Sequence, residues 1–199
     1  MSDVSTTQRE TLAATRTSEV DHRDADLARP YAQVSLLLVP CIGGLVWVAT
    51  RPATALARST EILGPVVALL GLTAAVFVLM FTARHGAILW RKAPIAFFRN
   101  FDGAEVPDWV ERPARTFNNL MQAPTVFYVA CAFMLQTGLV DSVQLALAWV
   151  FVAARVAHAI VFIGWNAVRW RFATALVAFA ALGTILHRFA VQSFPLWAW

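Results

Sequence analysis

Long uninterrupted runs of apolar residues follow a polar beginning of the chain. Residues 30–50 and 62–83 contain no charged side chain, and residues 116–140 form a third uncharged run. Two further apolar runs, 142–168 and 172–195, are each interrupted by one arginine and one histidine. Because a helix needs about 20 predominantly apolar residues to cross a bilayer, this pattern predicts five membrane-spanning helices.

Changes in polarity along the chain also predict its organisation. Residues 1–30 mix acidic, basic and hydroxyl side chains, which is typical of a disordered tail. Residues 31–61 hold the first apolar run and a loop, and residues 62–195 hold the other four runs. Residues 196–199 then form only the end of the chain. We therefore expect a polar tail, one added N-terminal span and a four-helix membrane domain.

The composition supports a membrane protein and excludes several other classes. Hydrophobic residues make up 59% of the 199 positions and charged residues only 14%. A soluble domain has about 45–50% apolar and about 25% charged residues. The net charge of +4 is spread over scattered arginines, so we expect no nucleic-acid partner. The two cysteines and four histidines form no disulfide framework or metal-ligand motif, and no metal is expected.

The distribution of basic residues predicts the orientation. Twelve of the sixteen Lys and Arg residues lie in the tail, in residues 84–115 and in residues 164–171. Five spans would place these three segments on one side of the membrane. Since loops rich in Lys and Arg stay in the cytoplasm, we expect a multi-pass protein of the cell (inner) membrane with a cytoplasmic N-terminus and an external C-terminus.

A group of polar side chains occurs where the third span begins. On a regular helix Arg115, Asn119 and Gln122 would lie on one face, at positions i, i+4 and i+7. A cation followed by two amides suits a ligand that carries carboxylates. Two structural alternatives remain. Glu111 precedes Arg115 by four residues, so the pair could merely stabilise the helix start, and the amides could bond neighbouring helices.

A second group of polar side chains lies deep in the fourth span. Arg155 is 14 residues from Asp141 at one end and 14 from Arg169 at the other. An arginine at this depth needs a protein partner, either in a binding site or as an anchor to carbonyls of adjacent helices. His158 follows on the same helix face and could be an ordinary hydrogen-bonded core histidine. Arg169 and Arg171 flank a tryptophan, which also fits an interfacial role without further function.

Taken together, these residues resemble a known family. The chain contains in order Arg115-x3-Asn119-x2-Gln122-x-Pro124 and Arg155-Val156-Ala157-His158. This pattern resembles the superfamily of membrane-associated proteins in eicosanoid and glutathione metabolism (MAPEG), over roughly residues 62–195. The resemblance implies an all-α, four-helix membrane bundle that assembles as a homotrimer and binds glutathione between subunits. Residues 31–61 would then add an extra N-terminal transmembrane helix.

Two positions depart from the pattern of the family. Relatives carry Glu where this chain has Gln122, and a carboxylate pairs better than an amide with the ammonium group of glutathione. Eicosanoid-making relatives carry Tyr where this chain has Phe162, so the hydroxyl group is missing. Nine residues further on, some relatives have the arginine that holds the glutathione thiolate, and this chain has Arg171.

The resemblance also implies the chemistry. A free thiol has a pKa of about 8.5 and reacts as the thiolate, and a nearby arginine favours the thiolate at neutral pH. Arg171 would fill that catalytic role and activate glutathione for attack on a lipophilic electrophile or for reduction of a lipid hydroperoxide. The implied glutathione-binding residues are Arg115, Asn119, Gln122, Arg155, His158 and Phe162.

Other functions remain open from the sequence. A non-catalytic member of the same fold would bind a membrane lipid or act as a scaffold, and Gln122 and Phe162 favour this alternative. A third possibility is an enzyme that uses a different anionic thiol. A transporter or channel is less well supported, because no pair of discontinuous spans or internal repeat is visible.

Overall fold

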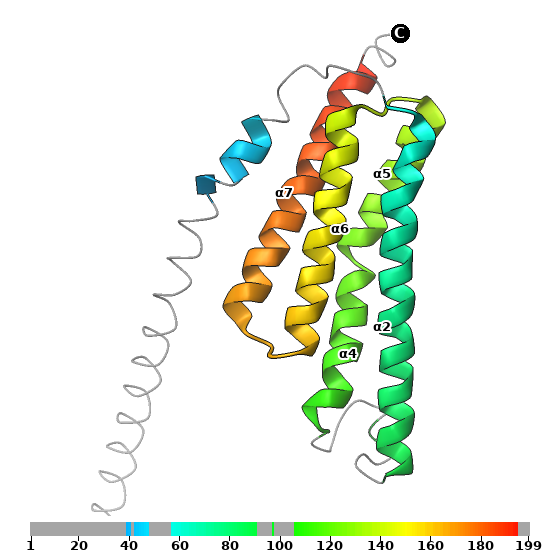
Figure 1. Cartoon of the computed structure of the whole chain (residues 1–199), viewed down its shortest axis with the longest axis vertical. Coiled ribbons are helices and arrows are strands. Elements are labelled where there is room, and N and C mark those ends of the chain that lie inside the picture. The colour runs from blue at the N-terminus through cyan, green and yellow to red at the C-terminus, as the bar shows by residue number, and fades with distance from the viewer. Residues whose placement is uncertain (1–38, 41, 48–56, 91–96, 98–105, 195–199) are drawn as a thin grey trace, which may run out of the picture.

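The computed structural model describes residues 39–40, 42–47, 57–90, 97 and 106–194 (Figure 1). Within these residues a short 3-10 helix leads into long helices that lie side by side. The elements are η1 (Ser59–Ile62), α2 (Leu63–Leu89), α4 (Asp108–Leu120), α5 (Ala123–Thr137), α6 (Ser142–Ile163) and α7 (Val168–Ser193). Helices α4 and α5 follow one another along a single path through the bundle, as Figure 1 shows.

Four segments of the described chain are long and apolar enough to cross a membrane. They are Ser59–Leu89, Asp108–Thr137, Ser142–Ile163 and Val168–Ser193. The predicted all-α membrane bundle with four spans after residue 61 is thereby confirmed. Of the added first span, residues 39–40 and 42–47 are helical, and its remainder lies outside the described residues. The predicted tail and the last four residues lie outside them as well.

A core of apolar side chains holds the four spans together. It includes Phe127 of α5 and Phe151 of α6, whose rings stack with centroids 4.7 Å apart, and both side chains are fully buried. Leu69 of α2 and Ile185 of α7 belong to the same cluster and are fully buried too. Because lipid is as apolar as leucine, close packing of this kind is what favours helix association within a membrane.

The third span is broken in the middle, which corrects one expectation from the sequence. Helix α4 ends at Leu120, and Gln122 is the N-cap residue of α5 with φ −95° and ψ −92°. Pro124 lies in the first turn of α5 and has no N–H to donate to the carbonyl of Leu120, so a continuous helix would lose a hydrogen bond there. The expected helical stripe therefore does not continue from Asn119 to Gln122.

The end of the bundle where α6 begins is fastened by a buried polar network. Asp141 caps α6 by accepting from the backbone N–H of Gln144, and the Gln144 side chain accepts from the backbone N–H of Asp141. The Asp141 carboxylate also accepts from Arg188 Nε at 3.0 Å and Nη2 at 2.6 Å, and from Gln192 Nε2 at 2.6 Å. This network ties the start of α6 to the end of α7.

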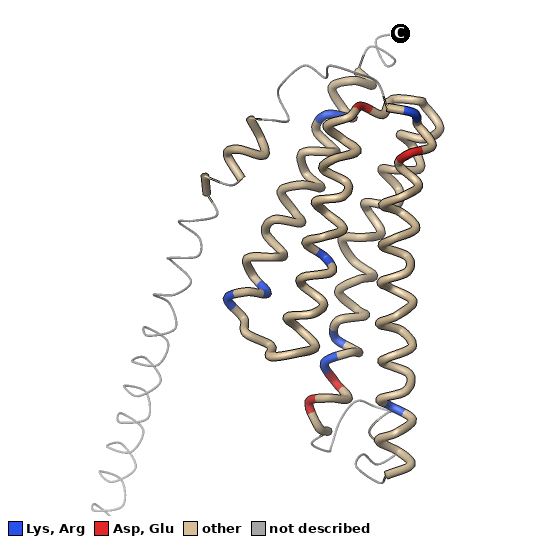
Figure 2. The backbone as a smooth tube through the Cα atoms, viewed as in Figure 1, with Lys and Arg blue, Asp and Glu red and all other residues tan. Residues whose placement is uncertain are grey.

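At the opposite end, the α6–α7 turn lies against the start of α4. Arg112 Nη1 of α4 donates to the carbonyl of Gly164 at 2.6 Å. In the turn, Asn166 has φ 52°, a left-handed conformation that asparagine adopts more readily than most residues. Figure 2 shows charged residues near both ends of the bundle. The described part of the 84–115 segment and the 164–171 turn thus share one end, as the sequence predicted.

Candidate functional site

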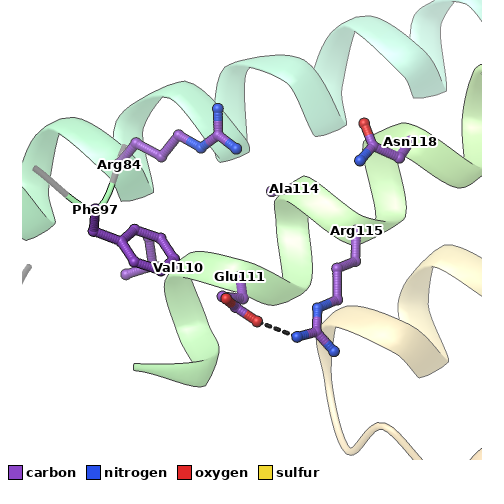
Figure 3. Close-up of a pocket in the computed structure, with 7 residues that line it drawn as sticks. All are labelled: Arg84, Phe97, Val110, Glu111, Ala114, Arg115 and Asn118. Atoms are coloured by element: carbon purple, nitrogen blue, oxygen red, sulfur yellow. Dashed lines mark hydrogen bonds and ion pairs between the residues drawn. The ribbon is translucent and has the colours of Figure 1, made fainter. Parts of the chain in front are cut away.

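A cavity of about 160 Å³ opens between α2 and α4 at the end that carries the α6–α7 turn (Figure 3). Arg84 reaches it from the last turns of α2, and Phe97 closes part of it. The remaining lining residues come from one face of α4: Val110, Glu111, Ala114, Arg115 and Asn118. Their spacing of three and four residues is that of one face of an α-helix.

The cavity is strongly polar for the end of a membrane helix. Arg84 and Arg115 bring two guanidinium groups, Glu111 brings one carboxylate and Asn118 brings an amide. Arg115 Nη2 donates to Glu111 Oε2, and the Arg115 side chain remains 67% exposed. Three of the described lining residues are thus charged, and two of them, Glu111 and Arg115, are paired with each other.

The buried arginine of the fourth span contacts the break in the third. Arg155 is 3% exposed, and its Nη2 donates to the backbone carbonyl of Asn119 at 2.5 Å. None of the ion pairs among the described residues involves Arg155. Asn119 belongs to the last turn of α4, and its carbonyl also accepts from the backbone N–H of Gln122 at 3.4 Å. Arg155 thus makes the anchoring contact to a carbonyl that the sequence allowed.

Three of the expected site residues lie together between α6 and α7. The guanidinium carbon of Arg171 lies 3.5 Å from the ring centroid of Phe162, and Arg171 Nη1 donates to Asn166 Oδ1 at 2.9 Å. His158 meets the Phe162 ring edge-on, with centroids 6.0 Å apart. The Arg171 side chain is therefore fixed by a ring on one side and by an amide oxygen on the other.

His158 has the hydrogen bonds of a structural histidine. Its Nδ1 lies 3.0 Å from the carbonyl oxygen of Arg171 and 3.1 Å from the hydroxyl oxygen of Thr174. Thr174 in turn donates to the carbonyls of Trp170 and Arg171. The imidazole thus links α6 to the first turn of α7 and is buried between them.

The expected site residues do not all come together in one chain. Arg115 is among the residues that line the cavity, although its guanidinium group turns away from Arg84 and α2 (Figure 3). Asn119 is joined to Arg155 through its carbonyl. Gln122 is exposed at the N-cap of α5, where its side chain makes no capping hydrogen bond. In the described part of the chain, no group of three or more His, Cys, Asp or Glu residues could hold a metal ion.

Sequence reasoning missed four residues that help to build this region. The spacing of Asp108 and Arg112 predicts only an ion pair within the helix, yet Arg112 also donates to the α6–α7 turn. Asn166 fixes Arg171, and the pair Gly164 and Asn166 is a recognisable turn signal between two apolar runs. Arg84 gave no such signal, because its approach to α4 depends on helix packing.

The comparison with known proteins supports the resemblance. The model of the MAPEG family matches residues 62–191, which extends from the end of η1 through nearly all of α7. No curated protein and no solved structure matches the chain. The matched segment contains every expected site residue from Arg115 to Arg171.

Proposed function

The chain belongs to the MAPEG family, and on this premise we propose that it is a glutathione-dependent transferase or peroxidase for lipophilic electrophiles. Its substrates would enter from the surrounding bilayer, since the site lies at the end of a multi-pass helix bundle. Glutathione would be a co-substrate, and the working unit would be a homotrimer in which neighbouring chains complete each site.

The observation that carries this proposal is the polar cavity on α4. Glutathione has two carboxylates and one ammonium group, and the residues that line the cavity include two arginines, one glutamate and one asparagine. Guanidinium groups pair with carboxylates through short, charge-assisted hydrogen bonds. Arg115, the first residue of the motif that resembles the family, is one of these groups. The cavity therefore has the charges needed for the peptide part of glutathione.

The proposed chemistry depends on Arg171. A guanidinium group held beside the sulfur stabilises the thiolate after the thiol proton has passed to solvent. In the transferase reaction the sulfur forms a bond to an electrophilic carbon and the leaving group departs. In the peroxidase reaction two glutathione thiols reduce a hydroperoxide to an alcohol and water, and they leave as the disulfide. Phe162 and Asn166 hold the Arg171 side chain in place.

A non-catalytic lipid-binding member is the second candidate. Phe162 favours it, because the ring at this position carries no hydroxyl group to donate to a reacting molecule. The exposed amide of Gln122 favours it as well, since a neutral group binds ammonium less strongly than a carboxylate. A related enzyme that uses another anionic thiol would share the same Arg115 and Arg171 chemistry.

Glutathione-dependent thermal stability of the purified protein in detergent tests the proposal. A ligand that binds only the folded state adds about 2.7 kcal/mol at a hundred times its dissociation constant. We expect a saturable rise in Tm in the wild type and its loss in Arg115→Ala. Arg58→Ala is the matched control, because Arg58 precedes η1 at the other end of the bundle. If millimolar glutathione leaves the wild-type Tm unchanged, glutathione is not the ligand.

A further inference from the structure

The first turn of α7 carries a positive charge that has no acidic partner in the described part of the chain. Arg169 is exposed, and its guanidinium carbon lies 5.8 Å from the centre of the Trp170 ring. None of the ion pairs that the described residues form includes Arg169. The sequence contains no Asp or Glu after Asp141, and Figure 2 shows basic but no acidic residues at the start of α7. Arg169 can therefore pair with an anion from outside the chain.

The described acidic residues at this end of the bundle already have partners of their own. On α4, Asp108 pairs with Arg112 and Glu111 pairs with Arg115, each across one turn of the same helix. These two acids are thus matched by two arginines of α4, and the arginines of α7 add positive charge that the described acids do not balance. A surplus of Arg close to the membrane surface attracts anionic lipid headgroups.

The backbone that leads to Arg169 is held in a fixed conformation. Arg112 Nη1 donates to the carbonyl of Gly164 at 2.6 Å. The backbone N–H of Gly164 donates to the carbonyl of Ile160 at 2.9 Å, and that of Asn166 donates to the carbonyl of Val161 at 2.8 Å. Because these bonds already order the α6–α7 turn, a ligand that binds there has little backbone freedom to remove.

Exposed aromatic side chains accompany this arginine. Trp165 in the turn and Trp170 in the first turn of α7 are both exposed. Phe172 is exposed as well, and it follows Arg169 by three residues, so the two side chains share one face of α7. Tryptophan favours the headgroup level of a membrane, where its ring meets apolar and polar groups together. The surface therefore combines a cation at the helix end with apolar contacts further along the span.

We infer that Trp165, Arg169, Trp170 and Phe172 form a binding surface for an anionic phospholipid, in which Arg169 pairs with the phosphate and an acyl chain lies along Phe172. A guanidinium group can bind two phosphate oxygens through parallel hydrogen bonds. A free phosphate ion would use only the arginine and leave the rings without a partner, whereas a lipid uses both. The lipid would hold the start of α7 at the headgroup level. It takes no part in the proposed thiol chemistry, so this inference stands apart from the proposed function.

Thermal unfolding of the full-length protein in a neutral detergent, without glutathione, tests this surface. The probes are phosphatidylglycerol, phosphatidylcholine and glycerophosphoglycerol, which is the headgroup of the first lipid without its acyl chains. Phosphatidylcholine has the same phosphate, but its choline group cancels the negative charge. We expect a saturable rise in Tm with phosphatidylglycerol and little change with the other two probes.

Removal of the arginine should weaken this response. We expect Arg169→Ala to bind phosphatidylglycerol about fivefold more weakly than the wild type, and to have the wild-type Tm without lipid because Arg169 is exposed. Arg58→Ala is the matched control, since it removes an exposed arginine at the other end of the bundle and should keep the wild-type affinity.

Four results would overturn the inference. They are no Tm response of the wild type to phosphatidylglycerol, an equal response to phosphatidylcholine, an equal response to the headgroup without acyl chains, and equal losses of affinity in Arg169→Ala and Arg58→Ala. The last would mean that net charge alone attracts the lipid. None of these results bears on glutathione binding, which Arg115→Ala tests separately.

Discussion

At the scale of single residues, the arginines of this membrane domain differ in what surrounds them. Arg155 is buried in mid-span against the carbonyl of Asn119, whereas Arg171 is stacked on Phe162 and held by Asn166. Arg115 is mostly exposed and paired with Glu111. In the proposed function, Arg155 anchors the helix break, Arg171 activates the thiol and Arg115 binds the ligand.

Replacing the ring beneath Arg171 should loosen the proposed catalytic group. A cation–π contact is worth about 0.5–2 kcal/mol, depending on its exposure to water. In Phe162→Leu we therefore expect the turnover of a model electrophile to fall several-fold, with little change in glutathione affinity. Phe179→Leu, which shortens an exposed ring of α7, serves as the control in the same steady-state assay. Equal turnover in Phe162→Leu and in the wild type would show that the contact between Arg171 and Phe162 does not affect turnover.

The sequence predicted some of these residue contacts for physical reasons. A mid-span arginine must find an acceptor inside the protein, so the bond from Arg155 to a neighbouring helix was foreseeable. The sequence could not predict which face of α4 meets α2, because that depends on how the two helices rotate against each other. The predicted place of Gln122 on the same helical face as Asn119 was wrong, since the spacing assumed an unbroken helix.

At the scale of the elements, the interruption between α4 and α5 is the main irregularity. The sequence contained its cause, because Pro124 cannot donate to the carbonyl of Leu120. The break lets the end of α4 turn its Asn119 carbonyl toward Arg155 of α6. An apolar run of 25 uncharged residues predicted one span correctly, but it hid two helices within that span.

Removal of this proline should alter the ligand site more than the stability. In Pro124→Ala the restored N–H favours a continuous helix, which would draw the Asn119 carbonyl into regular helical bonding. We expect glutathione to bind several-fold more weakly, while the Tm without ligand stays the same or rises. Pro65→Ala in the first turn of α2 is the control. Unchanged affinity in Pro124→Ala would mean that the break has no part in binding.

The buried polar network of Asp141, Arg188 and Gln192 at the other end of the bundle should affect stability alone. Asp141 is 1% exposed and Arg188 7% exposed, and removing one partner of such a buried pair costs about 3–5 kcal/mol. We expect Asp141→Ala to lower the free energy of unfolding by this amount in mixed-micelle titrations. Glu61→Gln, an exposed acid at the same end, should change it little. A loss below 1 kcal/mol would show that the ion pair is not needed.

At the scale of the whole molecule, the four described spans are unequally enclosed. Only 22% of the most apolar part of the first described span is buried within the chain, compared with 56% for α6. The remaining surface must face lipid or neighbouring chains. In the proposed homotrimer, part of this surface of α2 would be covered by neighbouring chains.

The oligomeric state can be measured directly. We expect native mass spectrometry of the detergent-released protein to give three chains per particle, and glutathione to increase the share of that species. The second effect follows because a ligand shared between chains favours their association. A stable monomer that still binds glutathione would contradict the intersubunit site, although the cavity within each chain would remain.

The architecture was the most predictable part of the molecule. Charge-free runs of about twenty residues leave few alternatives to membrane helices. The arginine-rich segments also predicted that the described part of residues 84–115 and the 164–171 turn share an end of the bundle. The helices extend past the apolar runs, however. Helix α4 begins at Asp108, eight residues before the uncharged run. Its polar first turns carry residues that line the cavity, such as Glu111.

Thiolate formation at Arg171 is the measurement that tests the proposed chemistry most directly. Ultraviolet difference spectra would be recorded as glutathione is added to the wild type, to Arg171→Leu and to Arg169→Ala at neutral pH. Arg169 is the control because it lies over Trp170 in the same turn and takes no part in the proposed site. We expect thiolate absorbance in the wild type and in Arg169→Ala, and its loss in Arg171→Leu while glutathione still binds. Full thiolate absorbance in Arg171→Leu, or bound glutathione without any thiolate in the wild type, would contradict the proposed activation.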